Sequence, residues 1–271
     1  MSYSVKEMIR KRKSVRTFNG ACLKAADRAK LEQFIRNQTN PFAVPVTFRL
    51  LDAKEYNLSS PVIVGTELYL AAKVERCNHH EIAFGYSFEQ VCLFAQSLGL
   101  GTVMLAASLS RAAFEKAMQV QGNEVLPAAS PVGYPAQKRS IRDSLMRKGL
   151  KADERIPFED LYFEGKYGNR LLRQNAGVWG EALEMARLAP SAGNRQPWRA
   201  VVDGEYVHFF EEKTLRDSVL GDIQKVDVGI ALAHFDLTAQ EEGYSGRFFE
   251  CDPEAETPDN VQYIISYERT E

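Results

Sequence analysis

The sequence predicts an α+β protein made of two similar halves, each with a central mixed sheet flanked by helices. Three observations lead to this prediction. The chain has 271 residues, which exceeds the usual size of a single domain. Segments of helical and of strand character are mixed along its whole length. Two pairs of segments also recur at nearly the same spacing.

The first recurring pair consists of two apolar segments, residues 85–99 and 229–243, at a shift of 144. Glycine, leucine, alanine, glutamine and glycine stand at matching places in both. Each segment is apolar on most sides and ends in glycine, which predicts two buried helices. The second pair, at a shift of 152, relates Leu31 to Leu183 and Pro45 to Pro197. Nearly equal shifts indicate a duplicated unit, although chance echoes within an α/β protein are the alternative.

The remaining elements alternate between helices and strands. Strands are predicted at residues 46–51, 61–64, 68–71, 199–202, 206–210 and 261–267. The boundary between the halves is expected near residues 161–180, which gives a first half of residues 1–165 and a second half of residues 166–271. Residues 252–260 are acidic and contain two prolines, as expected for a surface loop.

Composition argues against several classes of protein. The net charge of -2 does not suit a surface adapted to nucleic acid. Four cysteines without a framework spacing favour a reducing compartment. Cys77 precedes His79 and His80, but adjacent histidines point apart, so a solvated loop is favoured over a metal site. No apolar stretch reaches the roughly 18 residues of a membrane span, and no signal-peptide core is present, so we expect a cytoplasmic protein without metal.

A basic run at residues 10–18 is the first segment with chemical content. Its cations surround Ser14 at the end of an early helix. Guanidinium groups and a hydroxyl suit a phosphate monoester, because they offer directed hydrogen bonds to a doubly charged group. A solvated helix face and a nucleic-acid patch are the alternative interpretations.

Residues 181–198 form the second such segment. Glu181, Glu184 and Arg187 lie on one face of an amphipathic helix that ends at Pro190. The turn that follows contains serine, glycine, asparagine and glutamine within residues 191–196. Its amide and hydroxyl groups can recognise the edge of a heterocycle. The alternative is a capped loop whose polar groups satisfy only one another.

Residues 190–198, PSAGNRQPW, resemble the proline-serine-x-x-asparagine-x-glutamine-proline-tryptophan signature of the FMN-dependent nitroreductase family. Residues 12–18 resemble its N-terminal arginine-arginine-serine-x-arginine stretch, with lysine at the second position. Residues 98–102 resemble its glycine-leucine-glycine-threonine turn, and residues 133–135 its glycine-tyrosine-proline element. Residues 155–159 are similar to the basic element that closes the family's phosphate site. Together these motifs cover most of the chain.

The order of the motifs is unusual for that family. An ordinary member carries the signature early and binds FMN between the subunits of a homodimer, whereas here the signature comes last. The chain therefore resembles the single-chain branch, an intramolecular pseudo-dimer in which each half supplies part of one site. The first half's counterpart of the signature, residues 38–46, lacks the serine and the tryptophan. We therefore expect one FMN per chain, and a monomer is possible.

The resemblance also implies which residues bind the cofactor. Those expected at the phosphate and ribityl end are Arg12, Lys13, Ser14, Arg16 and Arg155. Those expected around the ring are Pro190, Ser191 and Asn194, with backbone N–H groups near Ala106 and Ala107 facing flavin N5. No catalytic side chain is implied, because the cofactor carries the electrons. For the aromatic residues Phe84, Tyr86 and Trp198, a place in the core is favoured over stacking on an acceptor.

The expected function is an FMN-dependent oxidoreductase that transfers electrons from NADH or NADPH to a small oxidised acceptor such as a nitroaromatic or a quinone. Two alternatives stay open: a non-catalytic flavin-binding or sensor protein, and a flavin-dependent dehalogenase-like relative. Neither nucleic acid nor a membrane is expected as a partner. A nucleic-acid binder would be colourless with a salt-dependent affinity, whereas a flavoprotein would be yellow.

Overall fold

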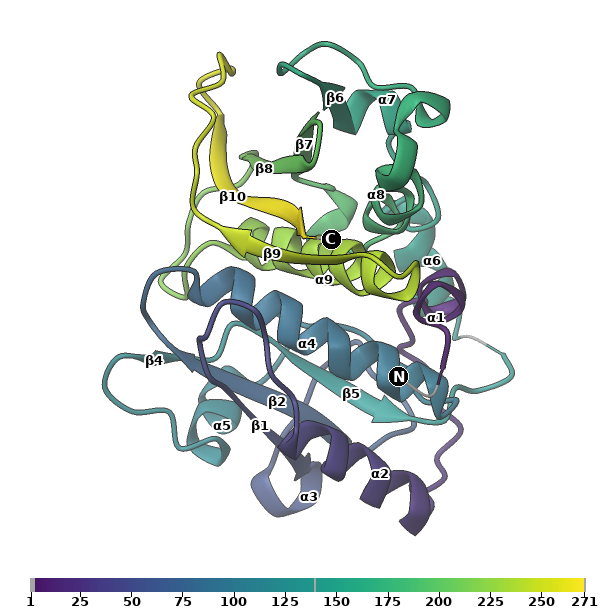
Figure 1. Cartoon of the computed structure of the whole chain (residues 1–271). Helices are drawn as coiled ribbons and strands as arrows, with labels where there is room; N and C mark the ends of the chain where they lie inside the picture. The colour runs from purple at the N-terminus through teal and green to yellow at the C-terminus, as the bar shows by residue number, and fades with distance from the viewer. Residues whose placement is uncertain (1–2, 139, 271) are drawn as a thin grey trace.

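Two five-stranded sheets lie on either side of a pair of long helices in the computed structural model, which describes residues 3–138 and 140–270 (Figure 1). One sheet and one long helix come from the N-terminal half of the chain, and the other sheet and helix come from the C-terminal half. The architecture is therefore α+β with two similar halves, as predicted.

The first sheet has the order β1-β2-β5-β3, and a further short strand, β4, pairs with β2. Its named strands all pair antiparallel, and a parallel bridge joins Ser14 to Thr102 at the β3 edge. This bridge brings the basic N-terminal segment against the sheet. The strands are β1 (Val46–Asp52), β2 (Leu68–Glu75), β3 (Gly101–Thr102), β4 (Glu124–Val125) and β5 (Ala129–Gly133).

The second sheet has the order β6-β7-β8-β10-β9. It is mixed, because β6 pairs parallel with β7 while the other neighbours pair antiparallel. The β7 strand follows directly on the turn at residues 190–197, so the sheet fixes the end of that turn. The strands are β6 (Tyr162–Glu164), β7 (Trp198–Asp203), β8 (Tyr206–Glu212), β9 (Ser245–Phe249) and β10 (Val261–Thr270).

The long helices α4 (His80–Ser97) and α9 (Ile223–Glu241) pack against each other between the sheets (Figure 1). Both are buried on most sides, which their apolar sequences predict. The close approach of α4 to α9 depends on two glycines. A Cβ on Gly85 would lie 2.0 Å from the carbonyl oxygen of Val226, and a Cβ on Gly229 would lie 2.2 Å from that of Ile82. The sequence shift of 144 thus relates the two contacts of the helix crossing, because it relates Gly85 to Gly229 and Ile82 to Val226.

Shorter helices surround this centre. Their bounds are α1 (Val5–Lys11), α2 (Ala25–Arg36), α3 (Ala53–Tyr56), α5 (Arg111–Ala117), α6 (Ile141–Gly149), α7 (Phe158–Leu161) and α8 (Gly180–Arg187), with 3-10 turns at Arg173–Asn175, Gly177–Trp179 and Ala192–Asn194.

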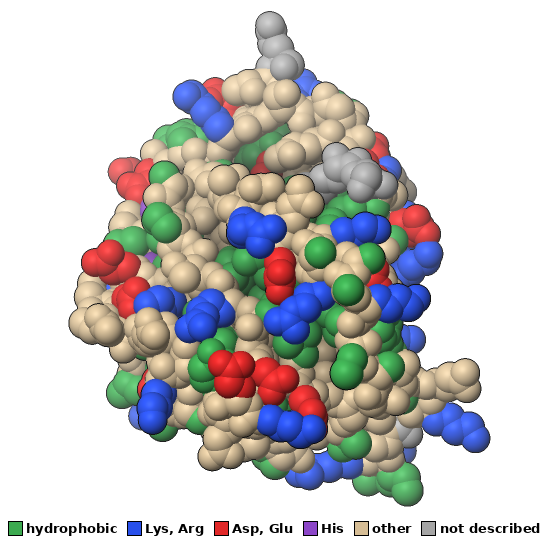
Figure 2. Space-filling view, turned by 90° about the horizontal axis from the view of Figure 1, so that it is seen from below, with side chains coloured by type: hydrophobic (Ala, Val, Ile, Leu, Met, Phe, Trp, Pro, Cys, Tyr) green, Lys and Arg blue, Asp and Glu red, His purple; other side chains and the backbone are tan. Residues whose placement is uncertain are grey.

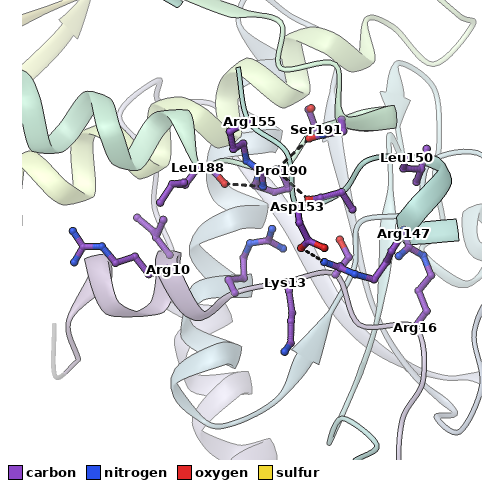
Figure 3. A pocket seen from close by; sticks show the side chains of 15 residues that line it. Arg10, Lys13, Arg16, Arg147, Leu150, Asp153, Arg155, Leu188, Pro190 and Ser191 are labelled. Atoms are coloured by element: carbon purple, nitrogen blue, oxygen red, sulfur yellow. Dashed lines mark hydrogen bonds and ion pairs between the residues drawn. The ribbon is translucent and has the colours of Figure 1, made fainter. Parts of the chain in front are cut away.

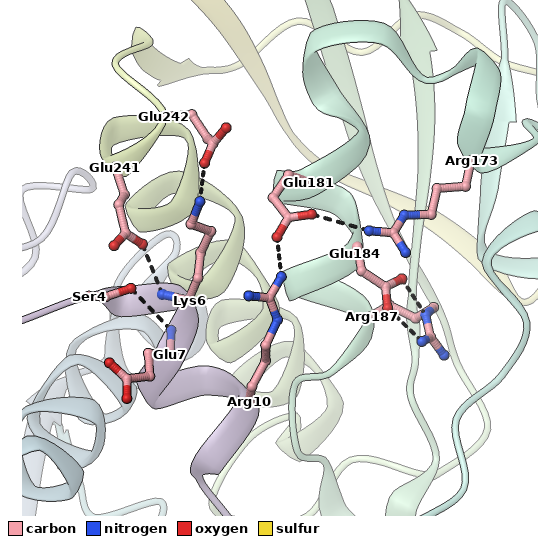
Figure 4. A network of polar contacts seen from close by, with 10 residues as sticks. All are labelled: Ser4, Lys6, Glu7, Arg10, Arg173, Glu181, Glu184, Arg187, Glu241 and Glu242. Carbon is pink, nitrogen blue, oxygen red and sulfur yellow. Dashed lines mark hydrogen bonds and ion pairs between the residues drawn. The ribbon is translucent and has the colours of Figure 1, made fainter.

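Helix α1 belongs to the first half but packs on helices of the second. Its apolar face, which includes Ile9, joins a buried cluster with Met185 of α8 and Leu237 of α9. Charged contacts surround this face: Lys6 pairs with Glu242, and Arg10 pairs with Glu181 (Figure 4). Exposed ion pairs contribute little free energy, so burial holds the helix and the charges favour its orientation. The basic segment that follows α1 is thereby placed at the boundary between the halves.

Most of the predicted elements are confirmed. The strands predicted at residues 46–51, 68–71, 199–202, 206–210 and 261–267 all form, and both predicted long helices form with earlier starts. The strand predicted at residues 61–64 is wrong: these residues form a turn, and only Val64 makes a bridge, to Thr17. Pro61 has no N–H to donate to a ladder, which disfavours a strand there.

The segment at residues 77–80 is less solvated than predicted. Cys77 is exposed, but His80 is buried at the start of α4, where its Nδ1 lies 2.7 Å from the carbonyl oxygen of Cys77. Across residues 3–138 and 140–270, His, Cys, Asp and Glu side chains form no group of three that could hold a metal ion.

The surface seen from the side of α2 and α3 carries charges of both signs. Lysine and arginine side chains stand among aspartate and glutamate side chains rather than in one continuous patch (Figure 2). None of the helices described is long and apolar enough to cross a membrane.

Candidate functional site

Two adjoining pockets form a cleft where the N-terminal basic segment meets the turn at residues 190–194. The first, which we call the arginine pocket, has a volume of about 220 Å³. The second, which we call the apolar pocket, has a volume of about 260 Å³. Six residues line both pockets, which makes the cleft continuous: Arg12, Ser14, Arg16, Leu150, Pro190 and Ser191.

The arginine pocket has a large excess of positive charge. One acidic residue, Asp153, lines it beside six basic ones: Arg10, Arg12, Lys13, Arg16, Arg147 and Arg155. In Figure 3, Arg147 reaches toward Asp153, whereas the Lys13 side chain points away from them. Lys13 is exposed and Arg10 is engaged with Glu181, so the four other arginines form the inner part of the pocket.

Three of these arginines have a buried nitrogen without a hydrogen-bond partner among the described residues. The atoms are Nε of Arg12, Arg16 and Arg155. Arg12 Nε lies 3.3 Å from Glu89 Oε1, close enough for an ion pair but not aligned as a hydrogen bond. Buried donors of this kind are costly unless an acceptor reaches them. An anion with several oxygen atoms is the ligand chemistry that fits this pocket.

Carboxylates balance part of the charge. Arg16 Nη1 lies 3.4 Å from Asp143 Oδ1, and Arg147 pairs with Asp153. No carboxylate pairs with Arg155 among the described residues; its guanidinium donates instead to backbone carbonyls, including that of Glu154 at 2.8 Å. Burial lowers the pKa of Arg155 to about 10, and the positive charges of Arg12 and Arg187 add to this effect. A bound anion would relieve that repulsion.

Hydrogen bonds join the turn at residues 190–196 to the segment that carries Arg155. The Asn194 side-chain amide donates to the carbonyls of Lys151 at 2.9 Å and Glu154 at 3.1 Å, and its Oδ1 accepts from Arg155 Nη1 at 3.3 Å. Gln196 is buried and accepts from the N–H of Ile156 at 2.9 Å. The amides of this turn therefore bind residues 151–156 rather than only one another, which differs from the capped-loop alternative, and Pro190 and Ser191 line the cleft.

The apolar pocket lies between the two halves. Residues from both long helices and from the loop after β3 line it, including Met104, Leu105, Ile223 and Ile230. Ala106 and Ala107 are in that loop, and neither of their N–H groups donates to a backbone carbonyl of the described residues. Two N–H donors beside apolar walls can bind a planar heterocycle at one edge.

The cleft brings together all ten residues that the sequence singled out. Eight line the arginine pocket: Arg12, Lys13, Ser14, Arg16, Arg155, Pro190, Ser191 and Asn194. Ala106 and Ala107 line the apolar pocket. Phe84, Tyr86 and Trp198 are buried in the core, which confirms that prediction.

A family model described as TM nitroreductase matches residues 4–239 of the sequence. The chain belongs to the TM nitroreductase family. Among curated proteins, no significant match to this nitroreductase is found.

The chain is similar to several solved structures. A nitroreductase-family protein of Thermotoga maritima MSB8 matches with a TM-score of 0.65 and 21% identity, over 99% of this chain and 94% of that one. A protein described as an oxidoreductase containing FMN matches with a TM-score of 0.51 and 14% identity, over 63% of this chain and 96% of that one. A protein of Bacteroides thetaiotaomicron described as an NADH dehydrogenase/NAD(P)H nitroreductase matches with a TM-score of 0.43 and 19% identity, over 52% and 91%.

The repeat relates the apolar pocket to a second position in the chain, and side chains fill that position. The shift of 144 relates Tyr86 to Ile230 and Asp236 to Cys92, two residues that line that pocket. Tyr86 instead donates to Asp236 at 2.6 Å, and Tyr267 donates to the same carboxylate at 3.1 Å. Phe42, from the counterpart of the signature, packs edge-on against Tyr86 with ring centroids 5.7 Å apart. Aromatic side chains therefore occupy the related position.

Several residues of the cleft carry no signal that the sequence motifs could reveal. Arg147 and Asp153 lie in a stretch without a recognisable motif, so no local signal marked them. Glu89 and Asp227 line the apolar pocket from within the two apolar helices. A charged residue in such a helix is a usable signal, because it needs a partner or a ligand.

Proposed function

We propose that this nitroreductase is an FMN-dependent oxidoreductase that transfers electrons from NADH or NADPH to small oxidised acceptors such as nitroaromatics or quinones. The observation that carries the proposal is the set of three buried arginine Nε atoms that have no partner in the described part of the chain, at the end of a cleft whose other end is apolar. FMN has the same division, with a doubly charged phosphate at one end and a planar ring at the other. The residues of the cleft therefore fit the cofactor.

The arginine pocket would hold the phosphate. Guanidinium forks offer paired N–H donors that match phosphate oxygens, and Arg12, Arg16 and Arg155 have donors to spare. Ser14 lines the same pocket and adds a hydroxyl donor. Because these groups are already buried and held by Glu89, Asp143 and backbone carbonyls, little ordering is required when the ligand binds.

The apolar pocket would hold the ring. Pro190 and Ser191 line one part of it, and Ala106 and Ala107 line it from the other half, where their N–H groups would be donors to the ring. N–H donors near ring atom N5 stabilise the electron-rich form and so favour electron uptake. When bound there, FMN supplies the electron transfer itself, and the chain's own residues bind, orient and exclude water.

The two halves, taken as residues 1–165 and 166–271, would share one site. The first half provides Arg12, Arg16 and Arg155, and the second provides Pro190 and Ser191. The aromatic cluster around Tyr86 occupies the related position and supports a stoichiometry of one FMN per chain. A complete site within one chain also allows the protein to act as a monomer.

Cofactor content and two rapid-mixing experiments test the proposal. The purified protein should be yellow and release one FMN per chain on denaturation. Mixing with NADH or NADPH should bleach the flavin, and adding a quinone or a nitroaromatic should restore the colour. A colourless protein that binds no added FMN would overturn the proposal. FMN that stays oxidised with either donor would indicate a sensor, and colour restored only by a halogenated aromatic would indicate a dehalogenase.

A further inference from the structure

Asp227 is a buried carboxyl group in the wall of the apolar pocket. It lies in the second turn of α9 and is only 2% exposed. The N–H of Ala192 donates to both carboxyl oxygens, at 3.1 Å to Oδ1 and 2.9 Å to Oδ2. Ala192 belongs to the turn that also carries Pro190 and Ser191. Asp227 therefore lies directly behind the turn and beside the space that we assign to the ring.

The surroundings of Asp227 favour its neutral form. Burial raises the pKa of Asp227 well above its usual value, and the negative charges of Asp222 and Glu211 act in the same direction. The hydrogen bond from Ala192 lowers the pKa; its effect is smaller than that of burial but larger than that of either charge. The other charged groups that line this pocket are Arg12, Arg16 and Glu89. A neutral carboxyl has an O–H to donate, which an ionised one lacks.

We propose that Asp227 is a catalytic acid, which delivers a proton to a quinone-type acceptor bound next to the ring at the apolar pocket. This inference rests on the proposed function. The geometry that carries it is a protonatable group in the pocket wall, held in place by a turn that lines the same pocket. Such an acid acts on the acceptor and leaves cofactor binding to the arginine pocket.

The step balances in atoms and electrons. Reduction of a quinone to a hydroquinone takes up one hydride, which carries two electrons, and one proton. The reduced cofactor supplies the hydride. The O–H bond of the Asp227 carboxyl breaks, a new O–H bond forms on the quinone oxygen, and the electron pair of the broken bond stays on the carboxylate. The carboxylate then takes a proton from solvent.

The proton-transfer step is tested by comparing the rates at which two acceptors reoxidise the Asp227→Asn variant. Asparagine keeps the shape and an oxygen acceptor for the Ala192 N–H, but its amide N–H groups are far too weakly acidic to deliver a proton. Reoxidation by benzoquinone should slow on the order of 100-fold, within the range for loss of a general acid. Reoxidation by ferricyanide, which accepts electrons without a proton, should change less than about threefold. Asp236→Asn, the same substitution farther along α9, serves as the matched control and should leave the ratio of the two rates unchanged.

A second readout does not depend on turnover. Infrared spectra of the ligand-free protein at neutral pH should contain the band of a protonated carboxyl that Asp227→Asn removes. In the wild-type protein, benzoquinone reoxidation should slow as pH rises through the Asp227 pKa while ferricyanide reoxidation does not. Equal slowing with both acceptors, an unchanged benzoquinone rate, or no such band would overturn the inference. Failure to bind FMN at all would overturn the proposed function instead.

Discussion

Gly85 and Gly229 occupy reciprocal positions where α4 crosses α9. Each lies against a carbonyl oxygen of the opposite helix, Gly85 against Val226 and Gly229 against Ile82, and both pairs are related by the same shift of 144 residues. Reciprocal contacts of this kind characterise a two-fold interface between identical subunits. Here both sides belong to one chain, and the interface forms the wall of the cleft.

Gly85→Ala and Gly229→Ala should each destabilise the protein by more than about 3 kcal/mol, because the added methyl would meet a backbone carbonyl and force the helices apart. Gly149→Ala is the matched control: this helical glycine has no atom within 4 Å of the added Cβ, and alanine should change stability by less than about 1 kcal/mol. Urea unfolding measures the difference. Similar losses for all three variants would contradict the close crossing.

Arg155→Lys should weaken FMN binding by about tenfold or more, because lysine loses the guanidinium fork and its buried Nε donor. Lys13→Ala should weaken it less than about threefold, because Lys13 is exposed at the edge of the pocket. Quenching of FMN fluorescence on titration into cofactor-free protein measures both affinities. An equal loss of FMN affinity in the two variants would contradict the assignment of Arg155 to the inner part of the pocket and of Lys13 to its edge.

Tyr86→Ala should cost about 3 to 5 kcal/mol of stability, because it removes a buried ring and leaves Asp236 with one donor fewer. It should not create a second flavin site, since the unpaired arginines lie only at the first site among the described residues. Thermal unfolding and the FMN released per chain are the two measurements. Two FMN per chain in this variant would refute a single phosphate site.

The stability of the wild-type protein should fall as pH rises from about 4.5 to about 7. Burial raises the pKa of Glu211 from its ordinary 4.5 to about 7, with a further contribution from the charge of Asp222. Between those values the folded state retains a proton that the unfolded state releases, so the free energy of unfolding decreases with pH. The loss should be on the order of 1 to 3 kcal/mol. In Glu211→Gln this part of the slope should vanish, and a slope equal to that of the wild type would exclude Glu211 as its source.

Local patterns were enough to predict most elements of the fold. Helices α4 and α9 were predictable because their apolar character is continuous, and most strands because their residue types favour extended backbone. The pattern failed at residues 61–64. These four residues have strand character, but the first is a proline and only Val64 forms a bridge to another segment among the described residues. Strand formation depends on a neighbour, which a single segment does not specify.

The amino-acid sequence by itself determined the duplicated plan and ten of the residues that line the cleft, because motifs and repeats are properties of the chain order. The tertiary structure decided what those residues face. It left Nε of Arg155 buried with no partner in residues 3–138 and 140–270, bonded the Asn194 amide to backbone carbonyls, and brought Asp227 into the pocket wall. It also placed the ring of Tyr86 in the position related to the pocket. Burial and charge surroundings arise from contacts between segments far apart in sequence, and no local pattern contains them.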